Sequence, residues 1–286
     1  MNLLDVVAEH LPHGYAIERT LGVGGTSTVY LATRAGDDNA RLVVKVLHGR
    51  ALRPGHADRF RREIEILQKL EHARIVPILA AGEADGVCFF TMPFVDGETL
   101  RARLHADGPL SARDTLLIAR DIADALGHAH GRGVVHRDVK PENVLISADG
   151  AQLMDFGFAS APSLMSHEAL DGEAALVIGT PHYISPEQVR GRQASDWRGD
   201  FFSLGCVMHE MLTGRPPWVA ASARELMRLR LADAAPDVRR LRADVPADVA
   251  AILRCNLAPY PNDRYATAAF LRMAIDSALA RMDEAA

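Results

Sequence analysis

The sequence predicts an α+β fold with two lobes, a small β-rich amino-terminal lobe with one helix and a larger, mainly α-helical carboxy-terminal lobe. Runs with strand-like alternation dominate as far as Met92, and a single amphipathic helix interrupts them. Pro93 to Gly97 then breaks the strand pattern, and from Leu100 onward the apolar residues recur at helical spacing. We therefore expect one domain over residues 1–286, with an amino-terminal lobe at 1–92, a hinge at 93–98 and a carboxy-terminal lobe at 99–286.

The composition is that of an ordinary soluble globular protein. Its 286 residues are enough to bury a core, 48% of them are apolar, 24% are charged, and the formal net charge is −5. These values argue against a disordered chain and against the overall excess of positive charge that is typical of nucleic-acid-binding proteins. We therefore expect no nucleic-acid partner.

The cysteines and the amino terminus indicate a cytoplasmic setting. Cys88, Cys206 and Cys255 are far apart and form no CxxC pair, which is typical of a reducing compartment without structural zinc. The first twelve residues carry Asp5 and Glu9 and lack a basic region, unlike a signal peptide. The chain contains no uncharged apolar run of the roughly 18 residues that a membrane span needs. A membrane or sensor segment beyond this chain stays open.

The amino-terminal lobe begins with a helix and a glycine-rich turn. Residues 2–11 are amphipathic at helical spacing, and we expect this helix to pack on the body of the domain. The run from Leu21 to Tyr30 contains Gly22, Gly24 and Gly25 between strand-like residues, which predicts a glycine hairpin. Closely spaced glycines let backbone N–H groups approach an anion, although an ordinary turn has the same appearance.

A strand and a helix then supply two charges that need explaining. In the strand Arg41–Leu47, Lys45 shares a face with Val43 and Leu47, which is costly unless an anion meets it. A lysine that reaches solvent at a sheet edge is the alternative. In the following helix, for which Asp58 is the expected cap, Glu63 borders the apolar stripe and is the natural partner of Lys45. An unrelated surface ion pair remains the other interpretation. The stripe consists of Phe60, Ile64, Leu67 and Leu70.

Two further strands are expected before the hinge, at Ile75–Leu79 and at Val87–Met92, separated by a turn between Gly82 and Gly86. In the carboxy-terminal lobe, a helix at 112–131 should end at Gly131 or Gly133. Its inward face comprises Leu116, Ile118, Ala119, Ile122 and Leu126. The segment 200–212 is apolar on nearly all sides and predicts a buried central helix. Further amphipathic helices end near Met282.

The stretch from Val135 to Gly157 carries the strongest chemical signal. Two apolar runs flank an Asp149-Gly150 turn and predict a hairpin that places Asn143 roughly opposite Asp155. Two oxygen donors at one end of a hairpin suit Mg²⁺, which keeps phosphate oxygens among its ligands. Asp138 lies just upstream, between Arg137 and Lys140. Each of these side chains alone would be equally consistent with capping a turn.

Taken together, the motifs resemble those of the eukaryotic-type serine/threonine protein kinases in their bacterial form. The resemblance covers about residues 12–275 and includes the glycine turn, the Lys45 strand, His136-Arg137-Asp138 and Asp155-Phe156-Gly157, in the family's order and spacing. It implies the two-lobed protein-kinase fold, with a five-stranded sheet and one regulatory helix in the small lobe and ATP in the cleft.

The resemblance also assigns roles to individual residues. The residues implied in catalysis are Asp138, Lys140, Lys45, Glu63 and Thr180. Those implied in nucleotide binding are Gly22, Gly24, Gly25, Val29, Val43, Lys45, Met92, Pro93, Val95 and Leu145, with the Pro93 carbonyl and the Val95 amide facing the adenine edge. Asn143 and Asp155 are the implied metal ligands, Arg264 is the expected buried partner of Glu187, and Asp200 should anchor the backbone of the catalytic loop.

Lys140 and Thr180 follow the serine/threonine pattern, and Thr180 is expected to bridge Asp138 and Lys140. The resemblance therefore implies transfer of the γ-phosphate of ATP to Ser and Thr hydroxyls of protein substrates, with autophosphorylation. Mg²⁺ is the implied metal, Mn²⁺ is an acceptable substitute, and a homodimer is left open. A nucleotide-binding pseudokinase or scaffold is the main alternative, and a small-molecule phosphotransferase is another. Both are disfavoured because the phosphate-handling residues and the Ser185-Pro186-Glu187 motif are present.

The sequence departs from the family pattern in several places. Ser27 stands for the third glycine of the loop, Val43 for an alanine above the adenine, and Pro93 for an acidic hinge residue. None of these changes affects the phosphate chemistry.

The segment before Thr180 also differs, because residues 170–175 contain no hydroxyl for a phosphate that Arg137 would receive. We hypothesise that Asp171 or Glu173 supplies part of that charge, although a carboxylate carries less charge than a phosphate. Ser163 and Ser166 remain alternative phosphorylation sites, and an acidic loop without this role is equally consistent with the sequence.

Overall fold

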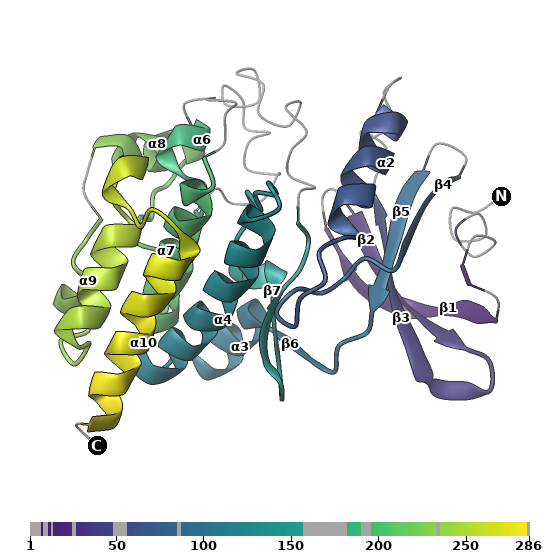
Figure 1. Cartoon of the computed structure of the whole chain (residues 1–286), viewed down its shortest axis with the longest axis horizontal. Helices are drawn as coiled ribbons and strands as arrows, with labels where there is room; N and C mark the ends of the chain where they lie inside the picture. Colours follow the sequence, from purple (N-terminus) through teal and green to yellow (C-terminus); the bar gives the residue numbers. More distant parts are fainter. Residues whose placement is uncertain are drawn as a thin grey trace. The chain divides into compact units, whose positions relative to one another are not determined.

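The computed structural model describes residues 7, 11–12, 14–24, 27–47, 56–84, 87–156, 182–189, 196–232 and 235–284 (Figure 1). The chain divides into two compact units. Unit 1 comprises Met1–His72 and Val76–Asp96, and unit 2 comprises Ala73–Ile75 and Gly97–Ala286. A β-sheet dominates the first unit and helices dominate the second, so the predicted α+β class with a β-rich part and a helical part is confirmed.

Unit 1 contains a five-stranded antiparallel sheet in the order β1-β2-β3-β5-β4 and the helix α2, His56–Leu67 (Figure 1). The strands are β1 Tyr15–Val23, β2 Ser27–Arg34, β3 Asp37–Leu47, β4 Ala80–Ala84 and β5 Val87–Pro93. The predicted alternation along β3 is confirmed: Leu42, Val44 and Val46 are buried, whereas Val43 and Lys45 are partly exposed on the other face. The buried face packs into a core with Ala32 and Phe89. One face of the sheet therefore supplies the core, and the other presents Lys45.

The strand predicted at Ile75–Leu79 is wrong, because β4 begins only at Ala80. Pro77 lies inside the predicted run and has no N–H to donate to a ladder. Ile75 is buried and forms a single parallel bridge to Leu153 in unit 2. Ile75 and Val76 are therefore buried in an irregular segment without strand pairing, whereas Leu79 at the end of the run is half exposed. In β4, glycine is favoured at position 82 because a Cβ there would lie 2.6 Å from the Phe89 ring.

The predicted cap of α2 is also wrong. The helix begins at His56, so Asp58 is its third residue and not its cap. The apolar stripe holds, since Ile64, Leu67 and Leu70 are buried and Phe60 is partly exposed. The predicted helix at 2–11 lies almost wholly outside the described residues, but Val7 is helical and fully buried in the unit 1 core.

Unit 2 contains a three-stranded sheet in the order β6-β7-β8 and a helical body. The strands are β6 Gly97–Thr99, β7 Val144–Ser147 and β8 Gly150–Leu153. The predicted hairpin is confirmed by the antiparallel pairing of β7 with β8, and β6 is an addition that the sequence did not indicate. The helices are α3 Leu100–Asp107, α4 Ala112–His130, α6 Pro186–Val189, α7 Arg198–Thr213, α8 Ala223–Ala232, α9 Ala247–Asn256 and α10 Ala268–Glu284. Short 3₁₀ turns lie at η1 Pro141–Asn143, η5 Val238–Arg240 and η6 Pro261–Asp263.

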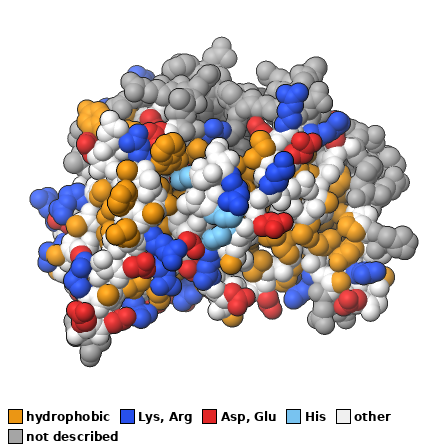
Figure 2. All heavy atoms as spheres, in the orientation of Figure 1, with side chains coloured by type: hydrophobic (Ala, Val, Ile, Leu, Met, Phe, Trp, Pro, Cys, Tyr) orange, Lys and Arg blue, Asp and Glu red, His pale blue; other side chains and the backbone are white. Residues whose placement is uncertain are grey.

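Helix α7 is the central post of unit 2, as predicted. All its residues from Gly199 to Leu212 are buried, and it packs against α4 and α9 (Figure 1). Helix α4 ends at His130 with Gly131 as its C-cap, as predicted, and its predicted inward face is buried. On the face shown in Figure 2, acidic and basic side chains are interspersed among apolar ones.

The segment Ala73–Ile75 belongs to unit 2 although its neighbours on both sides belong to unit 1. Arg74 lies 3.3 Å from the Asp121 carboxylate, and Leu153 N–H donates to the Arg74 carbonyl at 2.9 Å. Gln152 Nε2 donates to the Ala73 carbonyl at 3.0 Å. The tripeptide is therefore held by α4 and β8 of unit 2.

Candidate active site

Two of the predicted catalytic residues and one predicted metal ligand meet in one loop of unit 2. Lys140 Nζ donates to Asp138 Oδ2 at 2.6 Å, and Asn143 Nδ2 donates to the same oxygen at 3.0 Å and to the Asp138 carbonyl at 2.8 Å. Because a carbonyl can only accept, the nitrogen of the Asn143 amide must face Asp138, and the amide oxygen Oδ1 is directed elsewhere. This orientation leaves Oδ1 available as a ligand for a hard cation.

Asp200, in the first turn of α7, anchors this loop as the sequence predicts. Its buried carboxylate accepts from the backbone N–H of His136 at 2.9 Å and of Arg137 at 2.7 Å, and it contacts His130 Nε2 at 2.8 Å. Arg137 has a φ of 68°, a left-handed conformation that a non-glycine residue rarely adopts. The two backbone bonds to Asp200 hold Arg137 in this conformation immediately before Asp138.

His136 links the catalytic loop to the end of the hairpin. Its Nδ1 accepts from the N–H of Asp138 at 3.2 Å, so the proton lies on Nε2, which donates to the Met154 carbonyl at 2.9 Å. The ring also packs on Phe156, with centroids 4.5 Å apart. His136 therefore contacts the residues on both sides of Asp155, whose φ is 65°. The sequence analysis did not find this role, because it depends on contacts 18 or more residues away.

The hairpin places the two predicted metal ligands at the same end. Val144 pairs with Leu153, and Met154 N–H donates to the Asn143 carbonyl at 3.0 Å, so Asn143 lies opposite Met154. The prediction that Asn143 faces Asp155 is therefore correct to within one residue. An amide oxygen and a carboxylate are hard donors that fit Mg²⁺. Among the described residues, no group of three or more His, Cys, Asp or Glu could hold a metal, so this pair would need further oxygens from a phosphate ligand.

In unit 1, the sheet brings four predicted nucleotide-binding residues to one face. Val29 pairs with Lys45 across β2 and β3, and Val43 pairs with Met92 across β3 and β5. Directly paired residues point to the same face, and so do residues two apart along one strand. Val29, Val43, Lys45 and Met92 therefore share the face opposite the core.

The glycine hairpin that precedes this face is formed by β1 and β2. Gly22 pairs with Val29, and Gly24 N–H donates to the Ser27 carbonyl at 2.8 Å. A Cβ at Gly22 would meet nothing within 4 Å, and one at Gly24 would meet only Ser27 O at 3.5 Å. Contacts within the described chain therefore do not require glycine at these positions, which supports the approach of an external group. Gly25 lies outside the described residues.

Residues 93–95, in the predicted hinge, carry a contact that the sequence did not reveal. Phe94, between Pro93 and Val95, lies under the Arg41 guanidinium, whose carbon is 4.3 Å from the ring centroid. Phe94 N–H also donates to the Arg41 carbonyl at 3.4 Å. This pair restrains the backbone on which Pro93 and Val95 would meet adenine.

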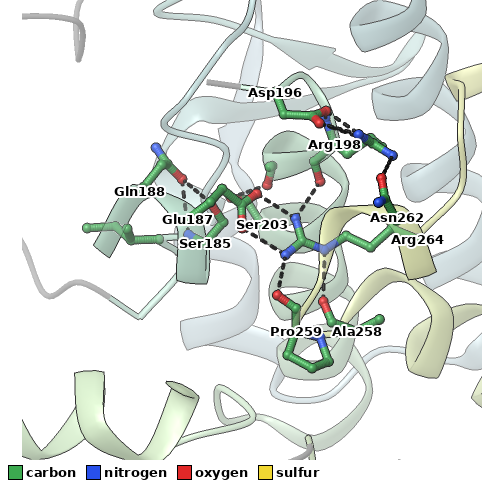
Figure 3. A network of polar contacts seen from close by, with 12 residues as sticks. Ser185, Glu187, Gln188, Asp196, Arg198, Ser203, Ala258, Pro259, Asn262 and Arg264 are labelled. Carbon is green, nitrogen blue, oxygen red and sulfur yellow. Dashed lines mark hydrogen bonds and ion pairs between the residues drawn. The ribbon is translucent and has the colours of Figure 1, made fainter. Parts of the chain in front are cut away.

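A second set of contacts holds residues 182–188 against α7 and α8. Glu187 forms a buried ion pair with Arg264, as predicted (Figure 3). Gln188 Nε2 donates to the Arg137 carbonyl at 3.1 Å. Arg230 is almost completely buried and donates to the carbonyls of His182 and Ile184. The sequence analysis missed Arg230, although its position four residues after buried Leu226 places it on the apolar stripe of α8.

Several predicted residues remain untested. The Lys45–Glu63 pair stays a prediction. Thr180 and the candidate charge-bearing residues Ser163, Ser166, Asp171 and Glu173 lie outside the described residues. Leu145 lies in β7, where it pairs with Gln152 and Thr99.

The sheet of unit 1, the helical body of unit 2 and the loop that joins Asp138, Lys140 and Asn143 define the protein kinase class. The comparisons agree: residues 15–274 match the protein kinase domain family, and the chain belongs to it.

The relatives include bacterial serine/threonine kinases. The chain is 39% identical over 270 residues to serine/threonine-protein kinase PknB of Mycolicibacterium smegmatis, covering 92% of this chain and 43% of that protein. It is 36% identical over 271 residues to PknH of Mycobacterium tuberculosis, covering 94% of this chain and 42% of that protein. The chain thus spans less than half the length of these relatives.

Solved structures show the same fold. The kinase domain of Mycobacterium tuberculosis PknI superposes with a TM-score of 0.72 at 27% identity, covering 93% of this chain and 95% of that one. Rad53, in complex with AMP-PNP, superposes with a TM-score of 0.74 at 26% identity, covering 91% of this chain and 64% of that one. No helix among the described residues has the length and apolarity needed to cross a membrane.

Proposed function

We propose that this chain is the catalytic domain of a serine/threonine protein kinase that transfers the γ-phosphate of Mg²⁺-ATP to Ser and Thr hydroxyls of proteins, including its own. The observation that carries the proposal is the Asp138–Lys140–Asn143 cluster, held in place by Asp200. Kinship with PknB and PknH supports the serine/threonine class.

In this proposal, Asp138 receives the acceptor hydroxyl. Both side-chain bonds to its carboxylate go to Oδ2, which leaves Oδ1 for the substrate, and 36% of the side chain is exposed. The hydroxyl oxygen forms a bond to the γ-phosphorus, the bond from that phosphorus to the β–γ bridging oxygen breaks, and the hydroxyl proton passes to Asp138. Lys140 carries a positive charge beside the reacting oxygens. The protein therefore contributes mainly positioning and charge.

Asn143 Oδ1 and the Asp155 carboxylate would hold the metal, for which Mg²⁺ is proposed and Mn²⁺ is an acceptable substitute. When bound, the metal neutralises charge on the phosphate oxygens. Lys45, held by Glu63, orients the α- and β-phosphates, and the backbone at Gly22, Gly24 and Gly25 covers them. Val29, Val43, Met92, Pro93, Val95 and Leu145 take the adenine, and Thr180 bridges Asp138 and Lys140.

We propose the lobe boundaries 1–92, 93–98 and 99–286 for this domain, with residues 93–98 as the hinge. We further propose a cytoplasmic setting, which the three free cysteines support. We also propose that the chain has no nucleic-acid partners. The mass of the domain measured in solution decides whether it forms a homodimer.

The test is to incubate the purified chain with labelled ATP, Mg²⁺ and a general protein acceptor, and to map the modified residues by mass spectrometry. We expect phosphoserine and phosphothreonine, and loss of the signal with EDTA. Asp138→Asn should lower the rate by about 10²- to 10⁴-fold, the range for loss of a general base, while nucleotide binding persists. Lys45→Met should weaken transfer as well. A parent chain that binds ATP but transfers no phosphate would indicate a nucleotide-binding scaffold. An Asp138→Asn variant as active as the parent would overturn the catalytic role of Asp138.

A further inference from the structure

Arg101 is a charged residue in an electrostatically unfavourable place. It is the second residue of α3, whose first turn contains no acidic side chain and is capped by the Thr99 hydroxyl. A cation near a helix amino terminus faces the positive end of the helix dipole. The position of Arg101 therefore needs partners outside its own helix.

Arg101 finds three such partners, and each one uses a different nitrogen. Nε donates to Glu142 Oε1 at 2.8 Å, Nη1 to Glu210 Oε1 at 2.7 Å, and Nη2 to the Tyr183 hydroxyl at 2.6 Å. The Tyr183 hydroxyl donates in turn to Glu210 Oε2. Four side chains from four separate segments of unit 2 thus form one closed network.

The network is partly shielded from water. Glu210 and Tyr183 are buried, whereas about a third of the Arg101 side chain is exposed. Burial, together with the adjacent Glu210 carboxylate, raises the pKa of Tyr183, so its hydroxyl remains a donor. Although burial opposes the effect, the bonds that Arg101 donates to Glu210 and Glu142 raise its pKa. Tyr183 therefore keeps its proton and Arg101 its charge at neutral pH.

One partner leads directly to the catalytic loop. Glu142 lies in η1 between Lys140 and Asn143, and this turn is closed by the bond from Asn143 N–H to the Lys140 carbonyl at 2.9 Å. The Asn143 side chain then holds Asp138. A shift of Glu142 would therefore change how Asn143 presents its amide oxygen.

The other partners lead to residues 182–188, which contain the Ser185-Pro186-Glu187 motif. Tyr183 is held at its hydroxyl by Arg101 and Glu210, and its carbonyl accepts from Ser203 Oγ at 2.7 Å. Gln188, five residues later, donates to the Arg137 carbonyl. The same segment therefore meets the catalytic loop twice, through Arg101 at Glu142 and directly at Arg137.

We propose that Arg101 is a positioning residue that ties the Asn143 turn to Tyr183 through Glu210. The catalytic loop and residues 182–188 then take their working geometry together and not independently. A planar guanidinium with three donating nitrogens makes this possible, and a lysine ammonium, a point donor, would not reach all three partners. The inference rests on the proposed kinase function.

The experiment compares Arg101→Ala, Arg101→Lys and the control Arg103→Ala. Arg103 lies on the same helix and, in the part of the chain that the structure describes, forms an ion pair with the exposed Asp107, so its removal changes the charge equally. For each variant, kcat, KM for ATP and amide hydrogen exchange in the peptide 138–147 are measured, with and without added methylguanidine. Arg101→Lys keeps a cation beside Glu210, so it still tests the role of Arg101 if Arg101→Ala does not fold.

We expect Arg101→Ala to lower kcat by about 10- to 100-fold, the scale for a misplaced catalytic group, with little change in KM for ATP. Exchange at Asn143 and Val144 should accelerate, and methylguanidine should reverse both effects. Arg101→Lys should be intermediate and Arg103→Ala should match the parent.

The proposal is overturned if exchange in 138–147 is unchanged in Arg101→Ala, or if Arg101→Lys matches the parent in both readouts. It is also overturned if kcat falls while methylguanidine restores neither readout. A parent chain without phosphotransfer would refute the proposed function instead, and the exchange rates with and without methylguanidine would still decide the role of Arg101.

Discussion

Arg264 and Glu187 form a buried ion pair with two parallel bonds, from Nη1 to Oε1 at 2.6 Å and from Nη2 to Oε2 at 2.9 Å (Figure 3). The remaining donors of Arg264 reach the carbonyls of Ala258, Pro259 and Arg198. All five N–H groups of the guanidinium are thus used, which only arginine can do. The pair joins the turn after α9 to α6.

Removing Arg264 should therefore be costly. Arg264→Met leaves the Glu187 carboxylate buried without a cation, and we expect a loss of about 3–5 kcal/mol in the free energy of unfolding. The double variant Arg264→Met/Glu187→Gln should recover part of this loss. Arg272→Ala, which removes an exposed ion pair with Asp124, is the control and should cost about 1 kcal/mol or less. Urea denaturation measures each value, and an Arg264→Met variant no less stable than this control would contradict the account.

Asp200 should be needed for rate more than for nucleotide affinity. Asp200→Asn replaces one acceptor oxygen by an NH₂ group that faces a backbone N–H of the catalytic loop, so Arg137 loses part of its restraint. We expect kcat to fall about 10- to 100-fold, as for a slightly misplaced catalytic group, with ATP affinity nearly unchanged. Asp276→Asn, an exposed helix residue paired with Arg272, is the control. Equal kcat in parent and Asp200→Asn would refute the anchoring role.

The Arg41–Phe94 contact should contribute to nucleotide affinity. Without the guanidinium, the hinge backbone that carries Pro93 and Val95 is less restrained. An exposed cation–π contact contributes about 0.5–1 kcal/mol, which corresponds to roughly a two- to fivefold rise in the ATP dissociation constant for Arg41→Ala. Calorimetric titration with ATP measures it, and Arg34→Ala on the exposed end of β2 is the control. If both variants bind ATP like the parent, the contact has no role in binding.

His209 should make stability depend on pH. It is fully buried in α7, its Nδ1 lies 2.9 Å from the Arg215 carbonyl, and Nε2 has no partner among the described residues. Burial lowers the pKa of His209, although the Arg215 carbonyl acts in the opposite direction.

Below about pH 6.5 the unfolded chain therefore takes up a proton at His209 that the folded chain does not, and stability falls as the pH drops. His209→Gln should lower the slope of the free energy of unfolding against pH by up to about 1.4 kcal/mol per pH unit. The exposed His105→Gln is the control. Identical slopes for the parent and His209→Gln between pH 6.5 and 5 would contradict the prediction.

Much of the fold follows from local patterns, and the errors have local causes. The alternation along β3, the inward face of α4 and the apolar character of α7 were predicted correctly because burial imposes a period on each element. The strand predicted at Ile75–Leu79 is wrong because apolar residues such as Ile75 can be buried without strand pairing, and Pro77 lacks the N–H that a strand ladder needs. β6 was missed because three residues are too few for a period to appear.

The sequence by itself determined the chemistry of the catalytic loop, because Asp138, Lys140 and Asn143 are so close along the chain that one turn brings them together. Only the tertiary structure decided how that loop is supported. Asp200 reaches it from 63 residues away, and Arg101 joins Glu142, Tyr183 and Glu210 from separate segments. From the sequence alone, each of these charged residues is indistinguishable from a charged residue on a solvent-exposed surface. Their pairing depends on how α3 and α7 pack, and no local period encodes that packing.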